Sequence, residues 1–126
     1  MAFAGRWQLE SHENYPEFAR KIGISEELIE KSKDAKPINE IQQNGTTFTL
    51  TTQYPQRIST NTITLDKPCE IDLPTGKKGI VTVTKQGDQV VCKMDGVHMT
   101  LEIIGGKLHE VIQLDDMVYK RTCKRV

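Results

Sequence analysis

Most of the chain alternates apolar and polar residues with a period of two, the pattern of a β-strand with one buried face. The first such segment covers residues 5–13, where Trp7, Leu9 and Ser11 alternate with charged and amide side chains. The same alternation predicts strands at residues 38–43, 46–53, 57–65, 70–72, 79–85, 89–94, 97–104, 107–114 and 117–124. Because no helical segment separates these later strands, we expect an antiparallel meander of about ten strands.

Turn residues separate the predicted strands. Asn44-Gly45 predicts a type I′ hairpin turn, because this turn needs positive φ at both central residues. Pro68, Pro74 and Gly76 confine the segment at residues 70–72 to a short strand. The remaining turn signals are Pro55-Gln56, Gly87-Asp88, Gly105-Gly106 and Asp115-Asp116.

Only residues 14–36 have a helical pattern, and they predict two short helices. Asn14 is expected to cap the first helix, with Glu17 completing a capping box, and Gly23 to end it. Ser25 is expected to cap the second helix, which cannot continue past Pro37. Each helix has one apolar side, too small for a core of its own, so the pair must lie on the strands. The residues expected to form this lid include Phe18, Ile22, Leu28 and Lys31.

Composition indicates a single domain, residues 1–126, with a modest core. Only 37% of the 126 residues are hydrophobic and 6% are aromatic. Lys plus Arg equal Asp plus Glu at 17 each, so the overall charge does not indicate a nucleic-acid partner. The first residues do not resemble a signal peptide, and the three cysteines have no disulfide or metal-binding spacing. We therefore expect a soluble intracellular protein with reduced thiols.

One face of the predicted strands mixes apolar side chains with hydroxyls and one guanidinium. Such a face suits a cavity for an amphipathic ligand, but it equally suits a solid half-polar sandwich, and periodicity alone does not separate the two. The residues assigned to this inward face are Asn39, Ile41, Phe48, Leu50, Thr52, Thr60, Thr62, Val90, Cys92, Met94, Met99, Leu101, Arg121 and Cys123.

The sequence contains little that indicates an enzyme. His12, His98 and His109 are scattered, no nucleophile or phosphate-binding motif occurs, and no His or Cys pair has metal-ligand spacing. Asp115-Asp116 is better explained as a hairpin turn than as a catalytic carboxylate pair. We therefore expect neither an enzyme nor a cofactor, and the remaining alternative to a carrier is an interaction module with a solid interior.

Several motifs also resemble the intracellular lipid-binding proteins, the fatty-acid-binding family. Gly5-Arg6-Trp7-Gln8-Leu9, followed by Asn14-Tyr15 and Phe18, is similar to the N-terminal signature of that family, although Pro16 replaces a usually acidic residue. The likeness extends over the whole chain, and its ending resembles the liver and ileal branch. The other matching segments are residues 40–45, 60–61, 76–78, 106–108 with Glu110, and 120–126.

This resemblance implies a ten-stranded up-and-down barrel with a helix-turn-helix lid that carries lipids through the cytoplasm. The Arg-x-Tyr clamp of the wider family is absent, since Cys123 stands at its tyrosine position, and Leu101 stands where that family has a second arginine. Arg121 remains the candidate for binding an anionic head group, unless it is paired with an internal carboxylate such as Glu110 or Asp72. Glu110 is therefore included in the candidate site.

The expected ligands are bile salts and long-chain fatty acids, with bile salts slightly favoured, and a selective fatty-acid carrier is the alternative. Four lysines on or beside the lid helices predict transient contact with anionic membranes, unless they form only a solvated helix face; these lid lysines are Lys21, Lys31, Lys33 and Lys36.

Overall fold

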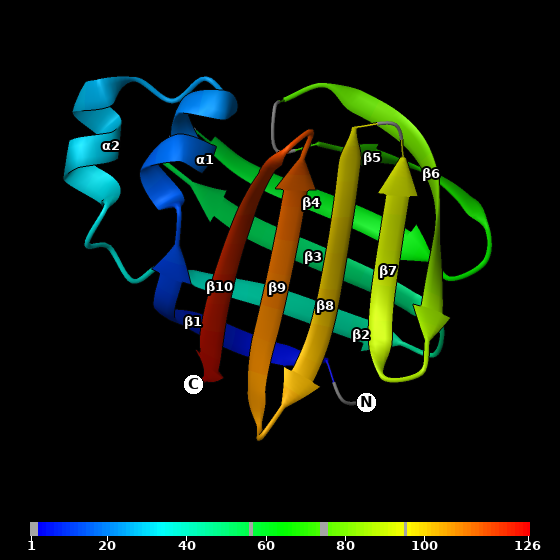
Figure 1. Cartoon of the computed structure of the whole chain (residues 1–126). Coiled ribbons are helices and arrows are strands. Elements are labelled where there is room, and N and C mark those ends of the chain that lie inside the picture. Colours follow the sequence, from blue (N-terminus) through cyan, green and yellow to red (C-terminus); the bar gives the residue numbers. More distant parts are fainter. Residues whose placement is uncertain (1–2, 56, 74–75, 95) are drawn as a thin grey trace.

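The computed structural model describes residues 3–55, 57–73, 76–94 and 96–126. Figure 1 shows ten strands and two helices formed by these residues. In chain order they are β1 Gly5–Glu13, α1 Tyr15–Lys21, α2 Glu26–Ser32, β2 Ile38–Asn44, β3 Thr47–Tyr54, β4 Arg57–Thr64, β5 Pro68–Asp72, β6 Lys78–Gln86, β7 Gln89–Met94, β8 Val97–Ile104, β9 Lys107–Leu114 and β10 Met117–Arg125. The predicted meander is confirmed, with small differences at strand ends. Gln56 and Pro74, part of the predicted turn signals, lie outside the described residues.

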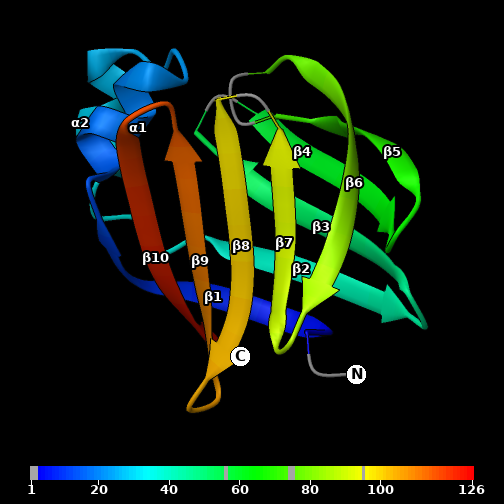
Figure 2. The same ribbon diagram turned by 45° about the vertical axis from the view of Figure 1, so that its right-hand side comes forward.

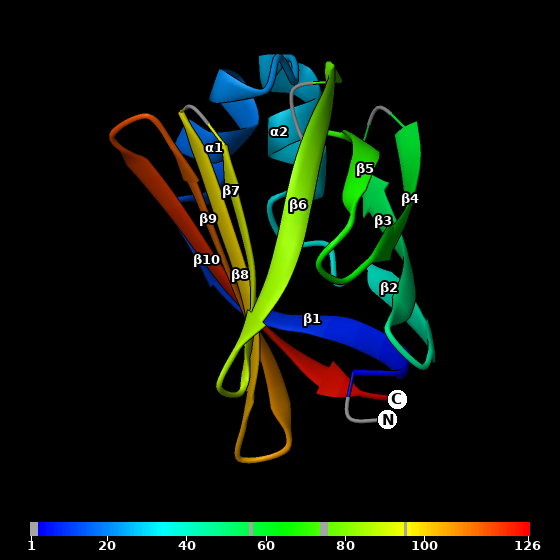
Figure 3. The ribbon, with the colours of Figure 1, turned by 90° about the vertical axis from the view of Figure 1, so that its right-hand side faces the viewer.

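Antiparallel neighbours form almost the entire barrel. The strand order is β4-β3-β2-β1-β10-β9-β8-β7-β6-β5, so β1 joins the last strand, β10, to the early strands. Seen edge-on, the strands form two layers that diverge toward the helices (Figure 3). Within the described residues, the hydrogen-bonded ladder is interrupted only between β4 and β5. The predicted fold, an up-and-down barrel with a helical lid, is thereby confirmed as a nearly closed barrel.

A side-chain amide bridges the interruption between β4 and β5. Asn61 Nδ2 donates to the Asp72 carbonyl at 3.1 Å, and Asp72 N–H donates to Asn61 Oδ1 at 2.7 Å. One primary amide therefore makes the two hydrogen bonds that a neighbouring strand would otherwise make. The seam is held by side chain to backbone contacts rather than by a ladder.

The two helices lie at the open end of the barrel, beside β10 (Figure 2). Ser25 caps α2 as predicted, its Oγ accepting from Leu28 N–H at 3.3 Å. The predicted capping box at Asn14 is wrong, because Asn14 adopts a left-handed conformation (φ 65°, ψ 29°) and its side chain makes no cap hydrogen bond. Its Nδ2 instead donates to the Val118 carbonyl of β10 at 2.8 Å. Neither described helix is long and apolar enough to cross a membrane.

The first hairpin turn differs from its prediction. Asn44 pairs with Thr47, so the central residues of the turn are Gly45 and Thr46. Only Gly45 has positive φ, at 63°, whereas a type I′ turn needs positive φ at both central residues. The prediction of a type I′ turn at Asn44-Gly45 is therefore wrong in both position and type.

The closed end of the barrel is filled by a hydrophobic core. Trp7 is fully buried there and its Nε1 donates to the Phe3 carbonyl at 3.0 Å. Arg125 covers the Trp7 ring, with the guanidinium carbon 4.2 Å from the ring centroid. A second apolar cluster joins the lid to the barrel: Phe18, Ala19, Ile22, Ile24, Ile29, Ile112, Leu114 and Tyr119. The space between the two clusters is where the candidate site lies.

Candidate functional site

A cavity of about 210 Å³ lies between the lid and the barrel. Aromatic rings make up much of its wall, and Arg121 reaches it from β10. Phe18 of α1 stacks on Tyr119 of β10 with ring centroids 4.3 Å apart, which fixes the lid against the strands. We call it the lid cavity; its lining residues are Leu9, His12, Tyr15, Phe18, Ser32, Ala35, Pro37, Gln53, Tyr54, Pro55, Ile112, Tyr119 and Arg121.

A second cavity of about 100 Å³ lies deeper in the barrel. Tyr54, Ile112 and Arg121 line both cavities and therefore stand between them. The expected cavity is thus divided into two smaller chambers. We call this second space the inner chamber; its lining residues are Leu50, Thr52, Tyr54, Asn61, Ile63, Ile71, Asp72, Val83, Val90, Cys92, Met99, Thr100, Leu101, Glu110, Ile112 and Arg121.

Arg121 forms a buried ion pair with Glu110, its cross-strand partner on β9. Arg121 Nη2 lies 2.6 Å from Glu110 Oε1, and the two side chains are 10% and 15% exposed. Among the described residues, neither Arg121 Nε nor Glu110 Oε1 has a partner with hydrogen-bond geometry. The contact is thus a close ion pair with hydrogen-bonding capacity left over on both sides. The predicted alternative, in which Arg121 pairs with an internal carboxylate, is confirmed with Glu110 as the partner.

The ion pair affects the groups around it. Burial disfavours the charged form of Arg121 and by itself would lower its pKa. Attraction to the nearby charges, above all the Glu110 carboxylate, exceeds this effect and raises the pKa of the guanidinium. Burial also raises the pKa of Tyr54 to about 12 and raises the pKa of Tyr119 further. Both phenols are therefore neutral hydroxyls at physiological pH, available to donate a hydrogen bond to a ligand oxygen.

Most of the predicted inward residues do face the interior. Leu50, Thr52, Val90, Cys92, Met99, Leu101, Glu110 and Arg121 line the inner chamber. Asn39, Ile41 and Cys123 line a void of about 10 Å³ beside Arg121. Asn39 is buried, and its Oδ1 accepts from Gln53 N–H at 2.9 Å. Phe48 and Met94 line neither cavity: Phe48 is buried in the apolar cluster that contains Trp7, and Met94 is half-buried and packs against that cluster.

The prediction that Thr60 and Thr62 face the interior is wrong. In the β3–β4 ladder they pair with Thr51 and Thr49, while the inward residues Phe48, Leu50 and Thr52 pair with Ile63, Asn61 and Ser59. Thr60 and Thr62 are exposed on the outer surface. Ile58 and Ile63 have opposite parity along β4, so hydrophobic pattern alone cannot choose the buried face. Ile63 is 6% exposed and Ile58 is 66% exposed.

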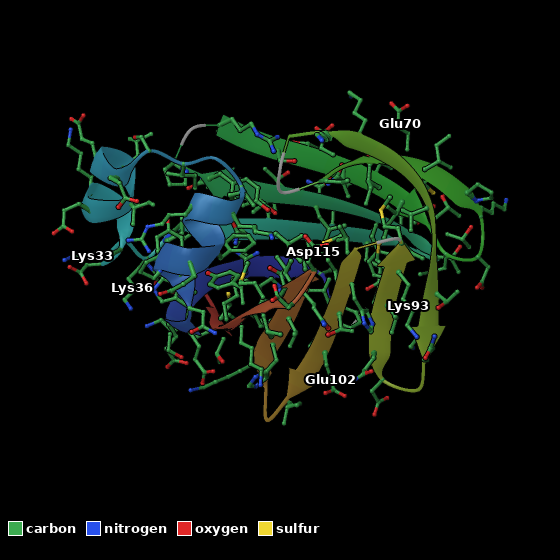
Figure 4. The ribbon with its side chains drawn as sticks, turned by 45° about the horizontal axis from the view of Figure 1, so that its top comes forward. Lys33, Lys36, Glu70, Lys93, Glu102 and Asp115 are labelled. Carbon is green, nitrogen blue, oxygen red and sulfur yellow. The ribbon has the colours of Figure 1, made fainter. Side chains whose placement is uncertain are left out.

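The predicted lid residues divide into packing and surface groups. Phe18 and Ile22 are buried against the barrel, Leu28 is half-buried, and Lys31 is exposed. The lid lysines are paired with nearby acidic or carbonyl oxygens: Lys21 with Asp115 at 3.2 Å, Lys31 with Glu27 at 3.0 Å, Lys33 with Glu30 at 2.8 Å and Lys36 with the Glu10 carbonyl at 2.9 Å. Figure 4 shows Lys33 and Lys36 beside the two helices, and the Lys36 ammonium reaches the backbone of β1.

Sequence reasoning missed several wall residues. Tyr54, Ile112 and Tyr119 follow from the alternation already used, because each lies two residues from a predicted inward residue. Asn61 and Ile63, which line the inner chamber, were missed because the wrong face of β4 was assigned to the interior. His12 was missed because the register of β1 with β10 shifts between Leu9 and Ser11, so that His12 rather than Ser11 faces the interior.

Cysteine and metal chemistry are not organised into a site. Burial raises the pKa of Cys92 to about 11 and raises the pKa of Cys123, so both thiols stay protonated at neutral pH. Within the described residues, no group of three or more His, Cys, Asp or Glu side chains is placed to hold a metal ion.

A lidded antiparallel barrel with a divided interior and a buried guanidinium has the architecture of a small-molecule binding barrel. Comparison with known proteins identifies the family. Residues 1–126 match the model of the lipocalin / cytosolic fatty-acid binding protein family. The chain belongs to that family.

Individual relatives span the chain completely. Rat gastrotropin is 39% identical over 127 residues, covering 100% of this chain and 99% of that protein. Mouse liver fatty acid-binding protein is 37% identical over 127 residues, covering 100% of both chains. The crystal structure of zebrafish ileal bile acid-binding protein complexed with cholic acid superposes with a TM-score of 0.86 at 36% identity, covering 100% of both chains.

Proposed function

We propose that this protein is a non-enzymatic intracellular carrier that binds amphipathic lipids, bile salts and long-chain fatty acids, inside a single barrel domain. The observation that carries the proposal is the pair of interior cavities that share Arg121. The similarity to gastrotropin, to liver fatty acid-binding protein and to a bile acid-binding structure supports the same class of ligand.

A lipid must occupy both cavities at once. Pockets for ligands of this size hold about 300–1,000 Å³, more than either chamber provides alone. Tyr54, Ile112 and Arg121 separate the two spaces, so ligand entry is expected to displace at least one of these side chains. Tyr54 is well placed to do so, because it lies at the end of β3 beside the lid cavity.

The anionic head group is expected to lie next to Arg121. Glu110 already neutralises part of the guanidinium charge, but Arg121 Nε still lacks a hydrogen-bond partner among the described residues. A carboxylate or sulfonate oxygen can accept from this Nε, while Glu110 can accept from a ligand hydroxyl. The arrangement therefore favours ligands that carry both an acid and hydroxyl groups.

This pattern favours hydroxylated bile salts slightly over fatty acids. Thr60 and Thr62, which the sequence assigned to the interior, lie outside and supply no hydroxyls to a ligand there. Thr52, Asn61 and Glu110 line the inner chamber instead and supply polar groups for ring hydroxyls. A selective fatty-acid carrier remains the alternative, because most of the residues that line the inner chamber are apolar and mouse liver fatty acid-binding protein is 37% identical to this chain.

Mass spectrometry of lipids that copurify with the protein tests the carrier proposal directly. Calorimetric titration with oleate and with a taurine-conjugated bile salt, at one pH and salt concentration, then ranks the two classes. We expect both to bind, with the bile salt equal or tighter. Oleate binding at least ~10-fold tighter would reverse the ranking, a difference of about 1.4 kcal/mol. Binding of neither would remove the proposed function.

Contact with membranes is proposed through the lid, with the protein monomeric in the cytoplasm. The lid lysines have local partners, so their attraction to anionic lipid competes with intramolecular pairs. Lys31 and Lys33 belong to exposed pairs of this kind, which contribute little to stability and exchange readily with solvent. Lipid transfer to anionic vesicles should therefore be faster than to neutral vesicles and should slow as salt is added.

A further inference from the structure

His12 lies where β1, the lid and β10 meet, and it faces the lid cavity. Its ring stacks on Tyr15 of α1, with centroids 4.9 Å apart and planes 20° apart. Its Nδ1 lies 3.2 Å from the Tyr119 hydroxyl of β10. The side chain is half-buried and is part of the cavity wall. The imidazole is therefore held in one orientation by two elements besides its own strand.

The strand register places His12 beside the buried ion pair. His12 is the cross-strand partner of Arg121, and Arg121 is the cross-strand partner of Glu110. Partners in adjacent strands project to the same face of a sheet, so the three side chains form one row across β1, β10 and β9. Arg121 Nη2 contacts Glu110 Oε1 at 2.6 Å. His12 thus flanks the guanidinium on the side opposite Glu110.

Most of the groups that face His12 favour its neutral form in the empty protein. Burial lowers the pKa of His12, and the cations of Lys36 and Arg121 lower it further. The Lys33 backbone and the Asp34 carboxylate oppose this shift. The titratable and charged groups around the ring are Tyr15 from α1, Tyr119 and Arg121 from β10, Glu110 from β9, and Asp34 and Lys36 after α2.

An anion bound beside Arg121 changes this balance. It adds negative charge within the same cavity, and a nearby opposite charge favours the protonated form of an imidazole. The Tyr119 hydroxyl can either donate to or accept from Nδ1, so this contact survives protonation. An imidazolium in this place also adds a second cation to the single guanidinium.

We propose that His12 is a specificity-determining residue that takes up one proton when an anionic head group binds beside Arg121, so that the carrier holds anionic amphipaths more tightly as pH falls. This inference rests on the proposed function, because it requires an anionic ligand in the lid cavity. The proton comes from solvent and returns to it on release. Uncharged amphipaths bind without this proton and show no such dependence.

The size of the effect follows from proton linkage. Each unit by which the bound anion raises the pKa of His12 increases affinity by up to ~10-fold once the pH is low enough to protonate the bound state. Between about pH 5 and 8, where histidine titrates, we expect affinity for a permanently charged sulfonate to rise by roughly 3- to 10-fold toward the acid end.

Calorimetry of a taurine-conjugated bile salt tests the proposal, because its sulfonate stays ionised across this range. The titrations compare wild type, His12→Gln and the matched control His109→Gln, in two buffers of different ionisation enthalpy. His109 is the cross-strand partner of Thr122 and follows the alternation to the face of β9 opposite Glu110. Wild type and His109→Gln should show proton uptake and the pH-dependent gain, and His12→Gln should show neither. A bile alcohol with the same rings is the neutral control.

Retention of the full pH dependence by His12→Gln, or binding by wild type without proton uptake, would overturn the role of His12 while leaving the carrier function intact. Failure of wild type to bind the bile salt and oleate at any pH would instead overturn the proposed function, and this inference with it. If His12→Gln does not fold, nuclear magnetic resonance titration of the wild-type imidazole decides the matter. Its pKa must rise on adding the bile salt, and an unchanged or lowered value contradicts the proposal.

Discussion

Replacing Glu110 by Gln separates the two effects of the buried ion pair, its part in stability and its competition with an anionic ligand. The substitution keeps the shape of the side chain but leaves the Arg121 guanidinium without its countercharge. Arg121 is 10% exposed at the side chain, so water cannot replace the lost carboxylate fully. We expect the empty protein to lose stability and the protein to bind sulfonate ligands more tightly.

The magnitude follows from the geometry. At an effective dielectric constant of about 20, two unit charges roughly 4 Å apart attract by about 4 kcal/mol. Removing one partner of a buried pair costs about 3–5 kcal/mol in measured cases, because a buried charge is left uncompensated. The Gln amide oxygen can still accept from Arg121, so we expect a loss near the lower end, about 3 kcal/mol. A sulfonate ligand at ~100 times its Kd would restore about 2.7 kcal/mol.

Urea unfolding with and without the taurine-conjugated bile salt measures both quantities. The matched control is Glu70→Gln, which removes one side of the exposed Lys78–Glu70 contact at 3.9 Å and should change stability by less than about 1 kcal/mol. Glu70 lies on the outer surface of β5 (Figure 4). A Glu110→Gln protein as stable as this control, or one with weaker sulfonate binding, would refute the reasoning.

Further predictions concern the head group, the seam, a buried phenol and the thiols. Arg121→Gln should weaken sulfonate and carboxylate ligands by about 1–3 kcal/mol in calorimetric titrations and leave a neutral bile alcohol unaffected, whereas equal losses would indicate a structural role. Asn61→Leu removes both hydrogen bonds between β4 and β5 and should speed hydrogen exchange of the Asp72 backbone amide. An unchanged exchange rate would argue against these hydrogen bonds. The pKa of Tyr54 is about 12 in the folded protein and near 10 in the unfolded chain, so the unfolded chain loses this proton first. The free energy of unfolding should therefore fall as pH rises between those values. Tyr54→Phe should lessen this fall in urea unfolding experiments at alkaline pH. In native protein at neutral pH, iodoacetamide should label the half-buried Cys69 before the buried Cys92, and the reverse order would contradict the burial assigned to them.

The sequence by itself determined the number and order of the strands and the presence of a lid. Apolar and polar residues alternate along the strands because one face of the barrel wall is buried and the other is exposed to solvent. Arg121 was also found from sequence alone, because an arginine two residues from a buried cysteine in a strand must face the same way. Those inferences use neighbours only one or two positions apart along the chain.

Tertiary structure decided everything that depends on which strands meet. The face of β4 followed from its register with β3, because Ile58 and Ile63 gave conflicting local signals. The Asn14 side chain does not cap α1 as predicted, because its amide donates to the carbonyl of Val118 on β10 instead. The row of His12, Arg121 and Glu110 arises from three strands that are far apart in sequence, and the energy of each charge depends on burial that no local pattern encodes. Local periodicity therefore determined the elements, and long-range pairing determined the chemistry between them.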